Sequence, residues 1–263
     1  MKNILDFYKA KEASKKISMV TCYDSWSAKI IESSHIDCIL VGDSLAMTMH
    51  GHKDTLKATP ELMALHVAAV REGAREKFVI GDMPFLAHRG SLDETLKAVS
   101  LIMRAGAQAV KIEGIEGSED TFAHIVDSGV PIMGHLGLTP QSYHKFGGFK
   151  VQATDDQATE WLLKQALKLE SAGCFAVVLE CVPAKVAEHV TANLKIPTIG
   201  IGAGKGCDGQ VLVFQDLMGF NHDFKPKFVR RYLQGFELLQ SAFNEFDRDV
   251  KAKTFPEQSE SFE

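Results

Sequence analysis

The sequence has no excess of positive charge, which argues against nucleic acid or an anionic membrane as a partner. Its 263 residues include 29 Lys and Arg against 34 Asp and Glu, so the formal net charge at pH 7 is -5. The basic residues are scattered and form no block of the kind that contacts phosphate groups. We therefore expect a small-molecule ligand, no nucleic-acid partner and no membrane partner.

Long apolar runs are missing as well. No segment approaches the roughly 20 apolar residues of a membrane-spanning helix. The first residues, MKNILDFYKAKEASKK, are charged every few positions and lack the apolar centre of a signal peptide. These two absences predict a cytoplasmic protein.

Cysteine is scarce, and its spacing carries no motif. The five cysteines are an odd number, lie far apart and form no CxxC pair; they are Cys22, Cys38, Cys174, Cys181 and Cys207. Neither a disulfide framework nor a zinc knuckle is indicated. We interpret them as reduced residues that mostly serve packing.

The sequence does contain a repeated alternation of strand and helix patterns. Helix starts are predicted by an N-cap at Thr59 and by capping boxes at Ser91 with Glu94 and at Thr154 with Gln157. Between the helical patterns lie eight short apolar runs typical of strands: residues 19–22, 38–43, 78–82, 109–113, 130–135, 175–180, 197–202 and 211–214.

This alternation predicts an α/β fold. Eight such units in about 250 residues are the expected size of a (β/α)8 TIM barrel. An N-terminal helix would precede it and a long amphipathic helix over residues 227–250 would follow. An open doubly wound sheet stays an alternative, because periodicity does not show closure. We expect a single domain over residues 1–263, with a flexible tail over 252–263.

Ionisable side chains stand at the ends of five consecutive predicted strands. They are Asp43, Asp82, Lys111 with Glu113, His135 and Glu180. Each one alone is explained more simply, as a turn former, a helix N-cap or a hydrogen-bonded rim residue. In a barrel, however, the C-terminal strand ends meet at one face, where such enzymes carry their chemistry. Their coincidence on strand after strand favours an active site.

Three of these residues together predict a metal site. Asp43, Asp82 and Glu113 would repel one another by several kcal/mol in a partly dry site unless a positive charge lay among them. A hard, all-oxygen set suits Mg²⁺ or Mn²⁺ better than zinc. A 2-oxo acid could bind such an ion through its carboxylate and keto oxygens.

Two loops also draw attention. The long polar connection over residues 139–156 is typical of an active-site loop. The glycine-rich run GIGAGKGCDGQ, residues 200–210, is neither a P-loop nor a GxGxxG motif. It predicts a flexible loop that allows close approach of the backbone to a ligand or to the next strand.

Several phrases together resemble, in order, the motifs of the ketopantoate hydroxymethyltransferase family. The resemblance runs from about Met19 to Tyr232, and its longest phrases are highly specific. The phrases are VGDSLAM (41–47), HVAAVREGA (66–74), GDMPF (81–85), AVKIEG (109–114), PIMGHLGLTPQS (131–142), LECVPA (179–184) and IPTIGIGAGKGCDGQVLV (196–213).

The resemblance implies a barrel of the phosphoenolpyruvate mutase and isocitrate lyase superfamily. It implies that a hydroxymethyl group passes from 5,10-methylenetetrahydrofolate to 3-methyl-2-oxobutanoate through an enolate stabilised by Mg²⁺, giving ketopantoate and tetrahydrofolate in pantothenate biosynthesis. It also implies a homo-oligomer, commonly a decamer.

The resemblance further implies a role for each site residue. Glu180 is the general base. The 2-oxo acid is bound by Asp43, Ser44, Asp82 and Lys111, with His135 beside it, and Mg²⁺ by Asp43, Asp82 and Glu113.

Two alternatives stay open. A sister lyase or mutase on the same metal barrel would share the carboxylates, although such enzymes usually carry a catalytic cysteine near the loop after the fifth strand, and residues 136–156 contain none. A barrel that only binds a metabolite would have no need of Glu180 opposite a metal site.

Overall fold

Eight parallel strands close into a barrel in the computed structural model, which describes residues 1–148, 150–223 and 225–262. Each strand pairs with the next along the chain, and the last pairs with the first. The strands are β1 (Ile17–Thr21), β2 (Cys38–Val41), β3 (Phe78–Asp82), β4 (Ala109–Glu113), β5 (Ile132–Gly137), β6 (Ala176–Glu180), β7 (Thr198–Ile201) and β8 (Gly209–Leu212). The predicted barrel is therefore confirmed, and an open sheet is excluded.

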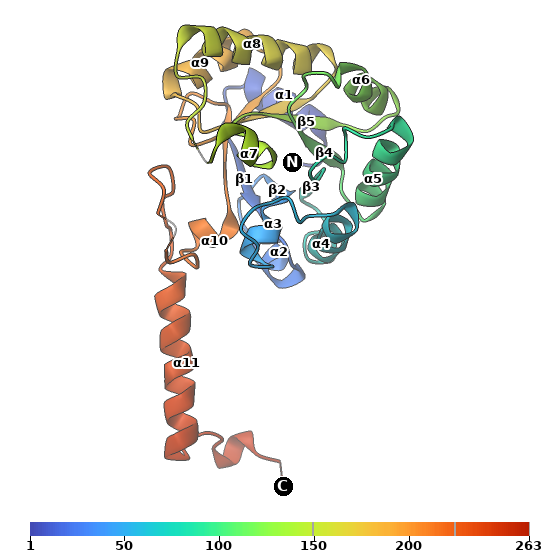
Figure 1. Cartoon of the computed structure of the whole chain (residues 1–263). Coiled ribbons are helices and arrows are strands. Elements are labelled where there is room, and N and C mark those ends of the chain that lie inside the picture. Colours follow the sequence, from blue (N-terminus) through green and yellow to red (C-terminus); the bar gives the residue numbers. More distant parts are fainter. Residues whose placement is uncertain (149, 224, 263) are drawn as a thin grey trace. The chain divides into compact units, whose positions relative to one another are not determined.

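Helices surround the strands (Figure 1). They are α2 (Ser25–Glu32), α3 (Leu45–Thr48), α4 (Pro60–Gly73), α5 (Leu92–Arg104), α6 (Glu119–Asp127), the 3₁₀ turn η1 (Pro140–Ser142), α7 (Tyr143–Phe146), α8 (Asp156–Ser171) and α9 (Ala184–Asn193). One unit departs from the regular pattern, because residues 202–208 connect β7 to β8 without a helix.

Most of the predicted helix starts are confirmed. Helix α4 starts after its predicted N-cap, and α5 has the capping box formed by Ser91 and Glu94. The capping box predicted at Thr154 is wrong. The N-cap of α8 is Asp155, whose side chain accepts a hydrogen bond from the backbone N–H of Ala158 at 2.8 Å. A carboxylate there also stabilises the positive end of the helix dipole.

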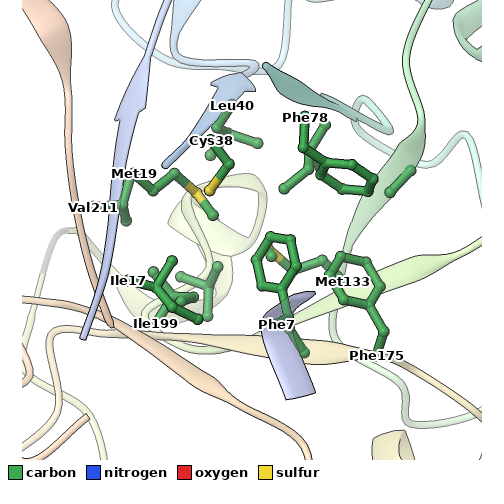
Figure 2. Packing of buried hydrophobic residues seen from close by; sticks show 14 of the residues in the cluster. Phe7, Ile17, Met19, Cys38, Leu40, Phe78, Met133, Phe175, Ile199 and Val211 are labelled. Carbon is green, nitrogen blue, oxygen red and sulfur yellow. The ribbon is translucent and has the colours of Figure 1, made fainter. Parts of the chain in front are cut away.

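The predicted N-terminal helix, α1 (Ile4–Glu12), packs against the barrel core. Phe7 is fully buried, and its ring lies 5.5 Å from that of Phe78 and 5.1 Å from that of Phe175, both edge to face (Figure 2). Phe78 begins β3 and Phe175 immediately precedes β6. Helix α1 therefore closes the N-terminal end of the barrel, and the opposite end remains for the predicted site.

The chain divides into two compact units, residues 1–213 and 214–263. The second contains α10 (Phe214–Leu217), α11 (Gly235–Ala252) and the 3₁₀ turn η2 (Gln258–Glu260). The single domain and the flexible tail stay predictions. None of the helices in the described part of the chain has both the length and the apolar character needed to cross a membrane.

The long helix predicted over residues 227–250 begins later than expected, because α11 starts only at Gly235. The backbone N–H of Tyr232 donates instead to the carbonyl of Leu217 at 2.8 Å. A Cβ atom at position 235 would lie 2.1 Å from the ring of Phe220. Tertiary contacts within this unit therefore override the amphipathic pattern.

Candidate active site

The register of the barrel places the predicted site residues beside one another at its C-terminal end. Asp82, the last residue of β3, pairs with Lys111 of β4. Glu113, the last residue of β4, pairs with His135 of β5. Glu180 is the last residue of β6. Neighbouring strands thus present these ionisable groups side by side.

Six of the eight predicted strand runs differ from the observed strands by one or more residues at an end, and two of these differences concern site residues. Strand β5 continues to Gly137, so His135 lies two residues before its end rather than at the end. Strand β2 ends at Val41, so Asp43 lies in the turn that follows. The Asp43 backbone N–H donates to Asp82 Oδ2 at 2.9 Å. This hydrogen bond holds Asp43 beside the other acids of the cluster, although strand β2 is shorter than predicted.

Lys111 is the positive centre of the cluster. Its side chain is buried, and Nζ lies 2.9 Å from Asp82 Oδ1 and 3.8 Å from Glu113 Oε1. Burial lowers the pKa of Lys111, but Asp82, Glu113 and Asp43 together outweigh it, so the pKa is raised. The ammonium therefore keeps its charge across the physiological range.

The three carboxylates are nearly withdrawn from water. Asp43, Asp82 and Glu113 are 4%, 1% and 6% exposed. Burial disfavours their charged forms and raises the pKa of Asp43 to about 6 and those of Asp82 and Glu113 to about 7. Each has a neighbouring carboxylate that adds to the rise, while Lys111 opposes it. The single ammonium of Lys111 does not balance the charge of three ionised carboxylates. A second cation would offset the remaining negative charge.

His135 connects the cluster to Glu180. Burial and Lys111 lower the pKa of His135 to about 4, so the ring is neutral. Lys111 Nζ lies 3.2 Å from Nδ1. An ammonium has only donors, so the contact with Lys111 favours Nδ1 as the acceptor and a proton on Nε2. Glu113 Oε1 also lies 3.2 Å from Nδ1. Nε2 lies 3.2 Å from Glu180 Oε2. The protonated ring nitrogen therefore faces the predicted base.

Glu180 is the most accessible acid of the group, with a side chain 17% exposed. The next residue, Cys181, has a left-handed backbone with φ of 48°. Burial and the neighbouring Glu180 raise the pKa of the Cys181 thiol to about 11, so it stays protonated. A protonated thiol is a poor nucleophile. Glu180 therefore stays the predicted reactive group at the end of β6, in preference to Cys181.

Ser44 is bound to a residue for which no role was predicted. Its Oγ lies 2.8 Å from the hydroxyl of Tyr23, which is 1% exposed. Burial raises the pKa of Tyr23, so the phenol is neutral. Tyr23 thus holds the Ser44 hydroxyl at the start of α3. In the described part of the chain, the Ser44 hydroxyl makes no hydrogen bond to a carboxylate of the cluster.

Gln141, in the η1 turn, is the main site residue that the sequence reasoning missed. Its side-chain Nε2 donates to Asp43 Oδ2 at 2.8 Å and to the carbonyl of Met83 at 2.9 Å. Its backbone N–H donates to Glu113 Oε2 at 3.0 Å. The signals were its place in the specific phrase over 131–142 and at the start of the predicted active-site loop.

The oxygen donors of the cluster suit Mg²⁺, although their side chains do not form a preorganised coordination site in the described part of the chain. Among the described residues, no three His, Cys, Asp or Glu side chains converge to hold a metal. Mg²⁺ is usually held by one or two carboxylates plus water and substrate. Asp43 and Asp82 are adjacent, and the buried Oε1 of Glu113 has no hydrogen-bond partner in the described part of the chain. The site therefore has oxygen donors of the right kind.

The glycine-rich run over 200–210 serves chain packing. A Cβ atom at Gly204, which has φ of +75°, would lie 2.4 Å from Cβ of Ala184 at the start of α9. A Cβ atom at Gly209 would lie 2.6 Å from the carbonyl oxygen of Ile17 in β1. The close approach predicted for this run is thus made to the preceding helix α9 and to the neighbouring strand β1.

Solved structures share this fold at low sequence identity. Phosphoenolpyruvate phosphomutase from Streptomyces platensis subsp. rosaceus has a TM-score of 0.64 and 11% identity, covering 95% of this chain and 88% of that one. The 2,3-dimethylmalate lyase of the PEP mutase/isocitrate lyase superfamily has a TM-score of 0.59 and 15% identity, covering 96% and 99%. At such identities the likeness shows the fold alone.

Sequence comparison gives the family. The model of ketopantoate hydroxymethyltransferase matches residues 1–258. The 3-methyl-2-oxobutanoate hydroxymethyltransferase of Bdellovibrio bacteriovorus is 55% identical over 262 residues, 100% of both chains. That of Coxiella burnetii is 55% identical over 255 residues, 97% of this chain and 96% of the relative. The chain therefore belongs to the ketopantoate hydroxymethyltransferase family and is a hydroxymethyltransferase, as its motifs predict.

Proposed function

We propose that this chain transfers a hydroxymethyl group from 5,10-methylenetetrahydrofolate to 3-methyl-2-oxobutanoate, giving ketopantoate and tetrahydrofolate for pantothenate biosynthesis. Water is consumed, so the atoms balance. The observation that carries the proposal is the buried Lys111 among three carboxylates, linked through His135 to the more accessible Glu180. Such a site combines a fixed positive charge with a base, as the removal of a proton next to a carbonyl requires.

Glu180 acts as the general base. It removes the C3 proton of the 2-oxo acid. Water cleaves the two C–N bonds of the folate methylene group, which releases tetrahydrofolate and formaldehyde. The enolate carbon then forms a C–C bond to the formaldehyde carbon, and the resulting alkoxide takes the proton back from Glu180. His135 would orient the base: its Nε2 lies 3.2 Å from Glu180 Oε2, although outside hydrogen-bond geometry in this structure, while Nδ1 lies 3.2 Å from Lys111 Nζ. A base held in one orientation needs no reorganisation as the proton moves.

Lys111 stabilises the charge that develops on the keto oxygen. The surrounding acids raise its pKa, so it stays an ammonium when substrate enters. Asp43, Ser44, Asp82 and His135 complete the predicted contacts to the 2-oxo acid. Asp43, Asp82 and Glu113 would hold Mg²⁺, which supplies Lewis-acid polarisation of the keto oxygen when bound.

The folate co-substrate and the homo-oligomer, a decamer in the family, stay predictions from the resemblance. The cytoplasmic location stays a prediction from the missing signal peptide and membrane span. Helix α11 exposes several large apolar side chains, as a surface used in assembly would: Leu238, Leu239, Phe243, Phe246 and Val250. The family match favours the transferase over a sister lyase or mutase and over a barrel that only binds a metabolite.

The proposal is tested by following the C3 proton of 3-methyl-2-oxobutanoate in D₂O by NMR. With Mg²⁺ present and folate absent, we expect the enzyme to exchange this proton for deuterium. The exchange should stop when EDTA removes the metal. Neither a lyase of an oxaloacetate-like substrate nor a passive binding protein exchanges it. Absence of exchange with Mg²⁺ present would count decisively against the proposed reaction.

Mg²⁺ affinity should rise with pH. The pKa values of Asp43, Asp82 and Glu113 are raised to about 6, 7 and 7, so below neutral pH protons compete with the cation. If one proton is displaced, the dissociation constant rises about tenfold for each pH unit below this range and levels off above it. Calorimetric titration of metal-free protein with Mg²⁺ at pH 5.5, 6.5, 7.5 and 8.5 measures the dissociation constant. A dissociation constant that does not change with pH contradicts the prediction.

A further inference from the structure

Gln141 occupies the point where the loop after β5 meets the site. It is 7% exposed, and its donors reach Asp43 after β2, Met83 after β3 and Glu113 at the end of β4. The contact with Asp43 joins residues 98 positions apart. One side chain and its own backbone N–H therefore link four neighbouring barrel units.

The orientation of this amide is fixed by its partners. A side-chain amide nitrogen has two N–H donors. Here both are used, one by Asp43 Oδ2 at 2.8 Å and one by the Met83 carbonyl at 2.9 Å. The reversed amide would set its oxygen against two acceptors in a buried position, which is strongly unfavourable. Gln141 is therefore a rigid double donor that holds one oxygen of Asp43 in place.

We propose that Gln141 is a positioning residue for the cation site: its side chain orients Asp43 and its backbone N–H orients Glu113. This inference rests on the proposed function, in which both acids bind Mg²⁺. Carboxylate ligands need such outer partners, and loss of one typically weakens metal binding by about 10- to 100-fold. The same bonds anchor Gln141 at the start of the loop after β5, so the order of residues 138–148 depends on the acids of the site.

The decisive variant is Gln141→Met, which keeps the length of the side chain and removes both of its N–H donors. The hydrogen bond from the backbone N–H of residue 141 to Glu113 is unaffected by this substitution. Gln165→Met is the matched control, because Gln165 is also a buried glutamine (5% exposed) whose Nε2 donates to a carboxylate, Glu116 Oε2, at 2.7 Å. Gln141→Asn, whose shortened amide cannot keep both contacts, is the second variant if Gln141→Met does not fold. Circular dichroism checks the fold of each.

Mg²⁺ binding to metal-free protein is measured by calorimetry, and hydrogen exchange is followed in peptides covering residues 138–148. We expect the Gln141 variants to bind Mg²⁺ about 10- to 100-fold more weakly. Their KM for Mg²⁺ in C3 exchange should rise by more than their kcat falls. Residues 138–148 should exchange faster. Gln165→Met should show none of these changes.

Two results overturn this inference alone. In the first, the parent protein binds Mg²⁺ and exchanges the C3 proton, and a folded Gln141 variant keeps the parent Mg²⁺ affinity. In the second, Gln165→Met loses as much Mg²⁺ affinity as the Gln141 variant. A parent protein that neither binds Mg²⁺ nor exchanges C3 overturns the proposed function, and the inference with it. The parent measurement therefore distinguishes the two failures.

Discussion

Replacement of Glu180 by Gln is expected to lower the rate of C3 proton exchange by about 10²- to 10⁴-fold, the usual contribution of a general base. The amide keeps the size of the side chain and its contact with His135 Nε2, which lies 3.2 Å from Glu180 Oε2 in the parent. It cannot accept a proton at neutral pH. Mg²⁺ and 2-oxo acid affinities should change little, because Glu180 is not among the acids in contact with Lys111.

The matched control is Glu116→Gln, which removes a carboxylate from the loop after β4 that pairs with Lys168. It should leave exchange unchanged. The measurement is the NMR exchange rate at saturating Mg²⁺ and substrate, with substrate affinity determined separately. If Glu180→Gln exchanges at the parent rate, Glu180 is not the base.

Replacement of Lys111 by Met is expected to affect stability as well as activity. The variant leaves Asp43, Asp82 and Glu113 buried without their ammonium partner. Removal of one member of a buried ionic group typically destabilises a protein by about 3 to 5 kcal/mol. C3 exchange should also fall sharply, because the fixed charge beside the developing enolate is lost.

The destabilisation caused by Lys111→Met depends on pH with a definite sign. The pKa values of the three acids already lie above their unfolded values and would rise further without Lys111. Carboxylates with raised pKa values destabilise the fold when charged, so the loss is largest above pH 7. It fades as the pH falls and is lost only below about pH 3 to 4, under the ordinary pKa values of Asp and Glu, where the acids are neutral in both the folded and the unfolded state.

Denaturant unfolding of metal-free protein at pH 5 and pH 8 measures this difference. Addition of Mg²⁺ at pH 8 should restore part of the stability, since it supplies the missing positive charge. Lys168→Met, which removes a lysine paired with Glu116 and Glu119 on the surface, is the control and should cost far less. A larger loss at pH 5 than at pH 8 would show that electrostatics is not the cause.

Much of the barrel follows from local patterns in the chain. The predicted runs over 78–82 and 109–113 are β3 and β4 to the residue. Short apolar runs followed by acids and turn formers have few other buried conformations, so their strand character is set locally. The capping box at Ser91 and Glu94 is equally local and formed as predicted.

The predicted helix boundaries were wrong where contacts with residues distant in sequence compete with a local pattern. The amphipathic pattern after Pro226 continues as a helix only from Gly235, because the segment before it bonds to residues near Leu217 and Met218. Asp155 replaced Thr154 as N-cap because both are good caps and one residue of difference is decided by the path of the chain. The exact start of such a helix is therefore not determined by the few residues around it.

The sequence by itself determined the alternation of strands and helices, the family and the strand ends at Asp82, Glu113 and Glu180, because periodicity and motif are properties of neighbouring residues. Closure of the barrel was decided only by the tertiary structure. Only the tertiary structure decided what those acids touch. The neutral His135 with its proton on Nε2 follows from the position of Lys111. The contact between Gln141 and Asp43 exists because barrel closure brings distant loops together. Hydrogen-bond partners across a site depend on distance in space, which the order of residues does not contain.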